Sequence, residues 1–165
     1  YRFFLMKGNL LMQINKFLSW LLVFLWMGVI FKLSSQAAEE SSTLSEGITK
    51  VIVETVKKVA PQSEISVDDL NHMVRKSAHF FSYLLLGLLT VNALYQSGYT
   101  GMAGVVLGLS ICVLYALSDE IHQIFVPGRG GQMRDVLIDS TGACVGIGIY
   151  ILAGRMIRKF KTRRA

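Results

Sequence analysis

Three short stretches of this chain bring acidic, basic or imidazole side chains together at helical spacing. Lys76, His79 and Tyr83 are spaced three and four residues apart, so a helix places them along one face. Asp135 and Asp139 have the same helical spacing further along the chain. The catalytic candidates are Asp119, Glu120, His79, His122 and Asp135, and the ligand-binding candidates are Lys76, Tyr83, Gln123, Arg129, Arg134 and Asp139.

These residue types can hold an anion and move a proton. Lys76, Arg129 and Arg134 can neutralise a phosphate or carboxylate group. Asp119 or His122 can accept or donate a proton beside it. The pattern therefore predicts a site for an anionic ligand, with acid–base groups at the same level.

A glycine-rich segment at 126–131 surrounds Arg129. Its glycines permit tight turns and exposed backbone amides, which suit a bound anion, although a plain turn explains them equally well. The carboxylates can also hold a cation, but no spacing in the chain makes a strong metal-ligand motif. We therefore expect no metal site, and the sequence identifies no cofactor.

The composition indicates that these polar groups belong to a membrane protein. The chain has 165 residues, of which 52% are hydrophobic and only 17% charged, and its net charge is +6. A soluble domain of this size has about a quarter charged residues. The length fits a single domain. The composition argues against an ordinary cytosolic enzyme, a disordered chain or a collagen-like repeat, and two cysteines are too few for a disulfide scaffold.

Four apolar stretches are long enough to cross a bilayer, which takes about 20 residues. They lie at 14–31, 78–95, 102–117 and 136–153. The predicted fold class is therefore all-α, an integral membrane bundle with four transmembrane helices. The first stretch also has features of a cleaved signal peptide, but its apolar run is long for one and Lys32 interrupts the approach to a cleavage site.

Basic residues predict the orientation of the bundle. Residues 155–165 hold six lysines and arginines and no acid, which is typical of a cytoplasmic tail. Four spans then put both termini inside, and the connections at 34–75 and 121–135 face outward. The candidate site residues therefore lie at the outer end.

The long outer connection is predicted to contain its own helix. Thr43 and Glu46 form a capping box, and apolar residues then recur at helical spacing until Pro61. This amphipathic helix is expected to lie on the outer bilayer surface or over the bundle. Ser66 and Asp69 form a second capping signal, which predicts a helix start near Val67.

Small residues on the last two spans predict close helix packing. Gly104 and Gly108 form one small-xxx-small pair, and Gly142 and Gly146 form another. The second pair continues the stripe of Asp139. We expect the acidic residues to face a shared interior.

Three segments together resemble the VanZ-like family of small bacterial membrane proteins. They are residues 76–83, residues 119–129 with the order Asp-Glu-Ile-His-Gln followed by Pro-Gly-Arg, and residues 135–146 with Asp135, Asp139, Gly142 and Gly146. The resemblance covers about 74–151 and implies a multi-pass protein of the bacterial cytoplasmic membrane. It also implies a cell-envelope role linked to susceptibility to the glycopeptide teicoplanin.

Two functional hypotheses remain open. In the first, a non-catalytic membrane factor binds a lipid-linked envelope precursor or a glycopeptide in an outer cavity. In the second, an enzyme acts on an outer-leaflet phosphorylated lipid or cell-wall precursor. Transport has less support because four short spans leave little room for a gated path. Membrane lipids are the expected partners, and the basic tail favours anionic lipid over nucleic acid.

Overall fold

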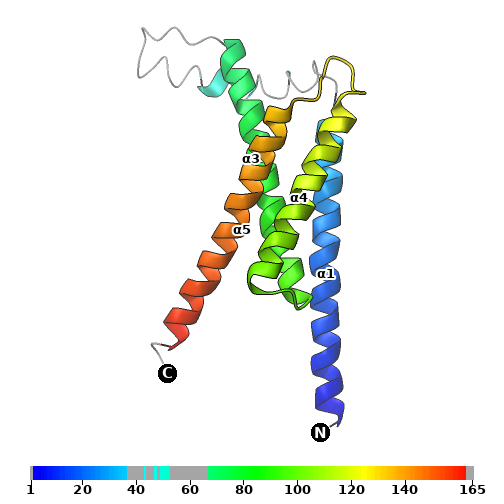
Figure 1. Cartoon of the computed structure of the whole chain (residues 1–165), viewed down its shortest axis with the longest axis vertical. Helices are drawn as coiled ribbons and strands as arrows, with labels where there is room; N and C mark the ends of the chain where they lie inside the picture. Colours follow the sequence, from blue (N-terminus) through cyan, green and yellow to red (C-terminus); the bar gives the residue numbers. More distant parts are fainter. Residues whose placement is uncertain (1, 37–42, 44–46, 48, 53–66, 163–165) are drawn as a thin grey trace.

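The computed structural model describes residues 2–36, 43, 47, 49–52 and 67–162. Within these residues the chain is all-helical and contains no strand, which confirms the predicted fold class. Figure 1 shows the long helices of the bundle. Their bounds are α1 Arg2–Ser34, α3 Val67–Gln96, α4 Gly101–Gln123 and α5 Met133–Thr162.

All four of these helices are long and apolar enough to cross a membrane. They contain the four predicted spans, but α4 and α5 extend beyond them at the polar end. The third predicted span stops at residue 117, whereas α4 continues to Gln123. The helix continues because Asp119, Glu120 and Gln123 are buried inside the bundle instead of facing lipid.

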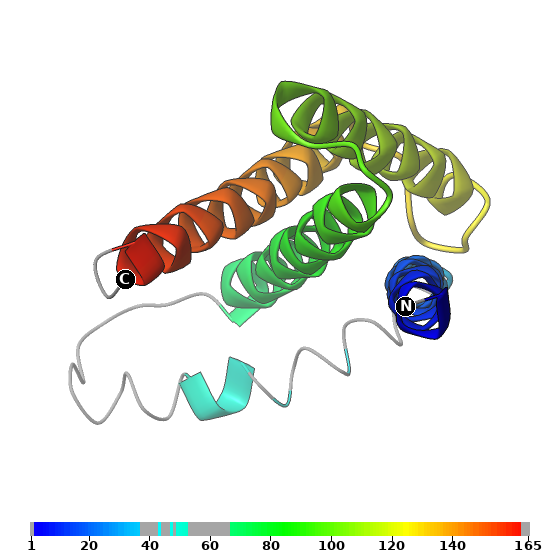
Figure 2. The same ribbon diagram turned by 90° about the horizontal axis from the view of Figure 1, so that it is seen from below.

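Helix α3 contacts each of the other three helices, which are arranged around it when the bundle is viewed along its length (Figure 2). Its most extensive contact is with α5. A Cβ atom at Gly142 would meet the carbonyl oxygen of Phe80, and one at Gly146 would meet that of Leu84. The predicted close approach at these glycines is therefore confirmed, and the partner is α3.

The glycine pair of α4 has a different environment. A Cβ atom at Gly104 would meet Tyr99 and Tyr95 in the turn that joins α3 to α4. Gly108 has only ordinary van der Waals neighbours. Close backbone packing in this bundle is thus concentrated between α3 and α5.

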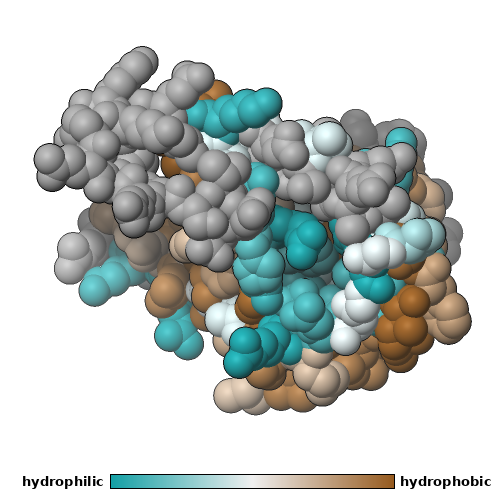
Figure 3. All heavy atoms as spheres, turned by 90° about the horizontal axis from the view of Figure 1, so that it is seen from above, coloured by the Kyte–Doolittle hydropathy of each residue, from teal (hydrophilic) through white to brown (hydrophobic). Residues whose placement is uncertain are grey.

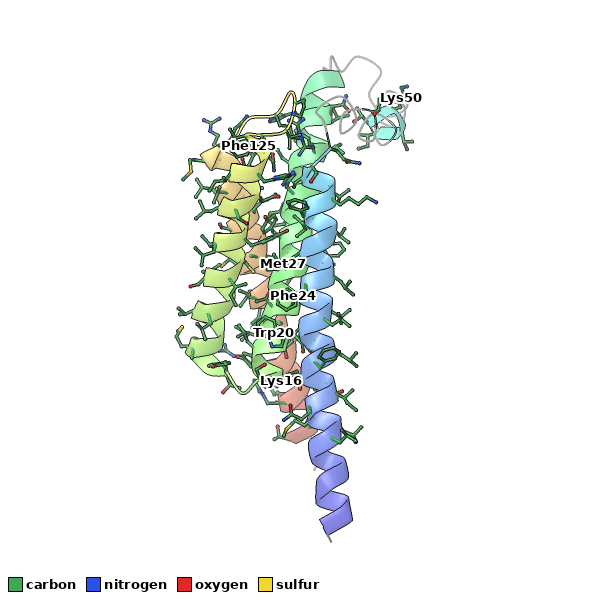
Figure 4. All side chains as sticks on the ribbon, turned by 90° about the vertical axis from the view of Figure 1, so that its right-hand side faces the viewer. Lys16, Trp20, Phe24, Met27, Lys50 and Phe125 are labelled. Atoms are coloured by element: carbon green, nitrogen blue, oxygen red, sulfur yellow. The ribbon has the colours of Figure 1, made fainter. Side chains whose placement is uncertain are left out.

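Hydrogen bonds join α1 to the rest of the bundle at several depths. The indole of Trp26 donates to the carbonyl oxygen of Ser82 at 2.9 Å, and the Tyr115 hydroxyl donates to the carbonyl oxygen of Met27 at 2.7 Å. Many apolar side chains of α1 are exposed and extend away from the bundle (Figure 4). In a bilayer this outer face contacts lipid.

The start of α1 and the end of α5 lie at one end of the bundle, and the end of α1, the start of α3 and the connection at 124–132 lie at the other (Figure 1). We call the latter the loop end. Helix α3 covers Val67–Gln96, in agreement with the capping signal. Residues 43, 47 and 49–52 of the predicted amphipathic helix are helical, and the rest of that segment lies outside the described residues.

Candidate functional site

Buried acidic side chains distinguish the loop end from the remainder of the bundle. The exposed fractions are 2% for Asp119, 5% for Glu120, 5% for Gln123 and 0% for Asp139. Seen from the loop end, hydrophilic side chains gather at the centre of the described surface, with hydrophobic ones at its flanks (Figure 3). Buried ionisable groups in a membrane protein are costly, so their concentration here marks a candidate functional site.

Three helices bring one imidazole and two carboxylates to a single point. His79 of α3, Asp119 of α4 and Asp139 of α5 offer ligand atoms that lie within 4.8 Å of one another. His79 Nδ1 lies 3.6 Å from Asp139 Oδ1. The predicted convergence of the three polar stripes is therefore present in the structure. We call these three residues the His–Asp–Asp cluster.

Only one carboxylate oxygen of Asp119 accepts hydrogen bonds from the described part of the protein. Ser34, the last residue of α1, donates its hydroxyl to Asp119 Oδ2 at 2.8 Å, and the Gln123 amide donates to the same oxygen at 3.3 Å. The other oxygen, Oδ1, is buried and has no hydrogen-bond partner among the described residues. This carboxylate is thus oriented, with one oxygen left to face the cluster.

A polar pocket of about 100 Å³ adjoins the cluster, and His79 contributes to both. We call it the loop-end pocket. Its wall combines the ends of α3, α4 and α5 with the glycine-rich turn, and the lining residues are Arg75, Lys76, His79, Gln123, Gly128, Arg129, Gly130, Gln132, Asp135 and Ile138.

Two cations of this pocket, Arg75 and Arg129, form no salt bridge within the described part of the chain, and Arg129 is the one with a buried, unpartnered nitrogen. It donates one hydrogen bond, from Nη1 to the carbonyl oxygen of Ser34 at 3.3 Å, and its Nε is buried without a partner. Burial, and then the nearby charge of Arg75, lower the pKa of Arg129 below its ordinary value. An anion in the pocket would relieve both effects.

Two further contacts stabilise the pocket wall. Lys76 Nζ and Asp135 Oδ1 form a salt bridge of 2.8 Å between α3 and α5. The backbone N–H of Gln132 donates to Glu120 Oε2 at 2.7 Å, which connects the loop to the end of α4. Lys76, Asp135 and Glu120 therefore have defined structural partners.

The structure does not bring every predicted residue to the pocket. His122 lies beside α1, where Nε2 is 3.1 Å from the Ser35 hydroxyl and the ring is 4.5 Å from that of Phe31. Arg134 is exposed and does not line the pocket. Tyr83 is fully buried one helical turn beyond His79, away from the loop end.

Sequence reasoning missed Arg75, Ser34 and Gln132. Arg75 is the neighbour of Lys76, and this adjacent pair of basic residues at the end of a span was the available signal. Ser34 lies at the end of the first span, where no motif in the sequence marks it. Its contact with Asp119 joins positions 85 residues apart, which local spacing does not reveal.

Comparison with known proteins identifies a family for the whole bundle. The sequence model of the VanZ/LLP1 family matches residues 18–154, which extends the resemblance to the first span. Comparisons with curated proteins and with solved structures give no match. With most of its length matched, and with the four apolar helices in place, the chain belongs to the VanZ/LLP1 family.

Proposed function

We propose that this chain is a cell-envelope membrane protein whose loop-end pocket binds the anionic group of a lipid-linked or phosphorylated envelope precursor. Through that ligand it changes susceptibility to teicoplanin-type glycopeptides. In this proposal the loop end faces outward, and both termini are cytoplasmic. The basic residues at the end of α5 favour that orientation.

The observation that carries the proposal is that Arg129 has a buried guanidinium nitrogen without a partner among the residues that the structure describes. Its guanidinium faces a pocket with Arg75 nearby, has no salt bridge within the described residues and keeps a buried, unpartnered Nε. Guanidinium groups bind phosphate and carboxylate through paired hydrogen bonds. The pocket volume of about 100 Å³ is far below that of sites for drug-sized ligands. It suits one compact anionic group at the headgroup level of a larger lipid.

Antibiotic susceptibility tests the proposal directly. Cells expressing Arg129→Ala should lose the change in teicoplanin susceptibility that the wild-type chain confers, because the pocket loses the guanidinium whose buried Nε has no partner among the described residues. Arg134→Ala is the matched control, since Arg134 has the same charge but is exposed and outside the pocket. Membrane abundance is compared by immunoblot. Equal effects of both variants would contradict a role for the pocket.

The alternative is an enzyme that modifies the same class of ligand. The observation in its favour is that His79 lines the pocket and also lies near Asp139, which puts an acid–base group beside the bound anion. Mass spectrometry of lipid-linked precursors from cells with wild type or Asp119→Asn separates the two functions. A covalently altered precursor only with wild type supports the enzyme, and identical precursors with different susceptibility support binding.

A further inference from the structure

The His–Asp–Asp cluster contains buried carboxylate oxygens that accept no hydrogen bond from the part of the protein that the structure describes. Both carboxylate oxygens of Asp139 and Oδ1 of Asp119 are buried without a hydrogen-bond partner among the described residues. The exposed fractions of these two residues are 0% and 2%. Buried acceptors are almost always satisfied in native proteins, so a group that interacts with these oxygens is missing from the protein's own side chains.

No basic side chain supplies the missing partner. Within the described residues, neither Asp119 nor Asp139 forms a salt bridge with a lysine or arginine, and Lys76 is paired with Asp135. His79 faces Asp139 at 3.6 Å, which is too long for a hydrogen bond. A single imidazole also carries at most one positive charge, whereas the ionised cluster presents two negative ones. The charge of Arg129 also acts on Asp119, but Arg129 forms no salt bridge with either carboxylate within the described residues, so a cation between the three residues of the cluster would satisfy the remaining oxygens.

We propose that His79, Asp119 and Asp139 bind a divalent transition metal ion, Zn²⁺ or Mn²⁺, at the base of the loop-end pocket. A mixed set of imidazole and carboxylate ligands fits these ions better than Mg²⁺ or Ca²⁺, which prefer oxygen alone. Metal–ligand bonds of about 2.1 Å place neighbouring ligand atoms about 3 to 3.5 Å apart. The present separations of up to 4.8 Å then need only a small closure around the ion.

The surroundings of Asp119 match those of a metal ligand. Carboxylates that coordinate a metal are themselves hydrogen-bonded through their outer oxygen, which fixes their orientation. Ser34 and Gln123 both donate to Oδ2 and leave Oδ1 free on the cluster side. Three protein ligands also leave at least one coordination position open. Because His79 lines the pocket as well, a ligand that enters from the loop end can reach the open coordination position.

Metal content of the purified full-length chain tests this inference. The protein in detergent is stripped with a chelator, dialysed against Zn²⁺ or Mn²⁺ and analysed by inductively coupled plasma mass spectrometry and titration calorimetry. We expect a single ion per chain for wild type and at least a tenfold weaker affinity for Asp139→Asn. His122→Ala is the matched control and should keep the ion, because His122 lies beside α1 and does not belong to the cluster.

A wild-type chain that takes up no stoichiometric ion, or an Asp139→Asn chain that binds as tightly as wild type, overturns the proposal. The first result would mean that protons balance the carboxylates. If Asp139→Asn does not fold, electron-spin-echo spectroscopy of Mn²⁺ on wild type still decides, since an imidazole ligand gives a nitrogen coupling and its absence excludes the site. These measurements need no envelope ligand, so their failure is distinct from failure of the anion pocket.

Discussion

At the scale of single residues, Ser34 connects the first helix to the candidate site. Its hydroxyl donates to Asp119 Oδ2, and its carbonyl oxygen accepts a hydrogen bond from Arg129. Ser34 is only 2% exposed. One residue at the end of α1 thus orients both a cluster carboxylate and the pocket cation.

Replacing Ser34 by alanine should destabilise the protein. The Ser34→Ala variant leaves Asp119 Oδ2 with only the long hydrogen bond from Gln123. Hydrogen bonds to charged groups contribute about 1.5–3 kcal/mol, so we expect a loss of that size in the free energy of unfolding. The measurement is denaturant unfolding of the purified protein in detergent, followed by circular dichroism.

Ser35→Ala is the control for this prediction. Ser35 follows the last residue of α1 and is exposed, and its hydroxyl contacts the carbonyl oxygen of Phe31 and Nε2 of His122 at the surface, away from Asp119. We expect a change of less than about 0.5 kcal/mol for this surface position. Equal losses in the two variants would show that the hydrogen bond to Asp119 does not stabilise the bundle.

At the scale of helices, the contact between α3 and α5 determines how His79 and Asp139 meet. Small residues allow the two backbones to approach, and this approach recurs along the helices at Gly142, Gly146 and, from the α3 side, Gly87. Gly142 follows Asp139 by three residues, so one of these close backbone contacts lies directly beside the cluster.

A methyl group at Gly142 should therefore separate α3 from α5. The Cβ atom of Gly142→Ala would collide with the backbone carbonyl of Phe80, which no rotamer change can move. Overpacking of this kind costs about 1–3 kcal/mol. Thermal unfolding in detergent measures the effect.

Gly148→Ala provides the comparison on the same helix. A Cβ atom there has no neighbour within 4 Å, so alanine is expected to be neutral or slightly stabilising through its helix propensity. The packing argument is wrong if the two alanine variants have the same melting temperature.

At the scale of the whole molecule, polar and apolar groups are divided by position along the bundle. Exposed apolar side chains occur on all four helices, whereas the buried acidic residues of the site lie near the loop end. The start of α1 and the end of α5 are at the opposite end (Figure 1). This division orients the candidate site toward one face of the membrane.

Cysteine labelling tests whether the loop end faces the outside of the cell or the cytoplasm. Phe125 is 79% exposed at the loop end and Phe160 is 61% exposed near the end of α5. In a background with both native cysteines replaced by alanine, Phe125→Cys should react with a membrane-impermeant maleimide in intact cells. Phe160→Cys should react only after permeabilisation, because the positive-inside rule puts this tail in the cytoplasm. The reverse pattern would place the pocket on the cytoplasmic side and contradict the proposed outer-leaflet ligand.

The sequence by itself determined the fold class, the four spans and most of the polar residues near the site. Those predictions depend on local properties: a hydrocarbon core requires about 20 apolar residues, and helical periodicity aligns residues such as Lys76, His79 and Tyr83. The same periodicity identified Asp119 and Asp139 as inward-facing acids, and both are buried.

Only the tertiary structure decided which of those residues meet. His79, Asp119 and Asp139 come from three different helices, so their separation depends on how each helix is rotated and on the contact that the glycines of α5 make with α3. Packing also placed His122 beside α1 and left Arg134 exposed. Helical spacing defines a face within one helix, but the neighbour of that face is determined by packing between helices distant in the chain.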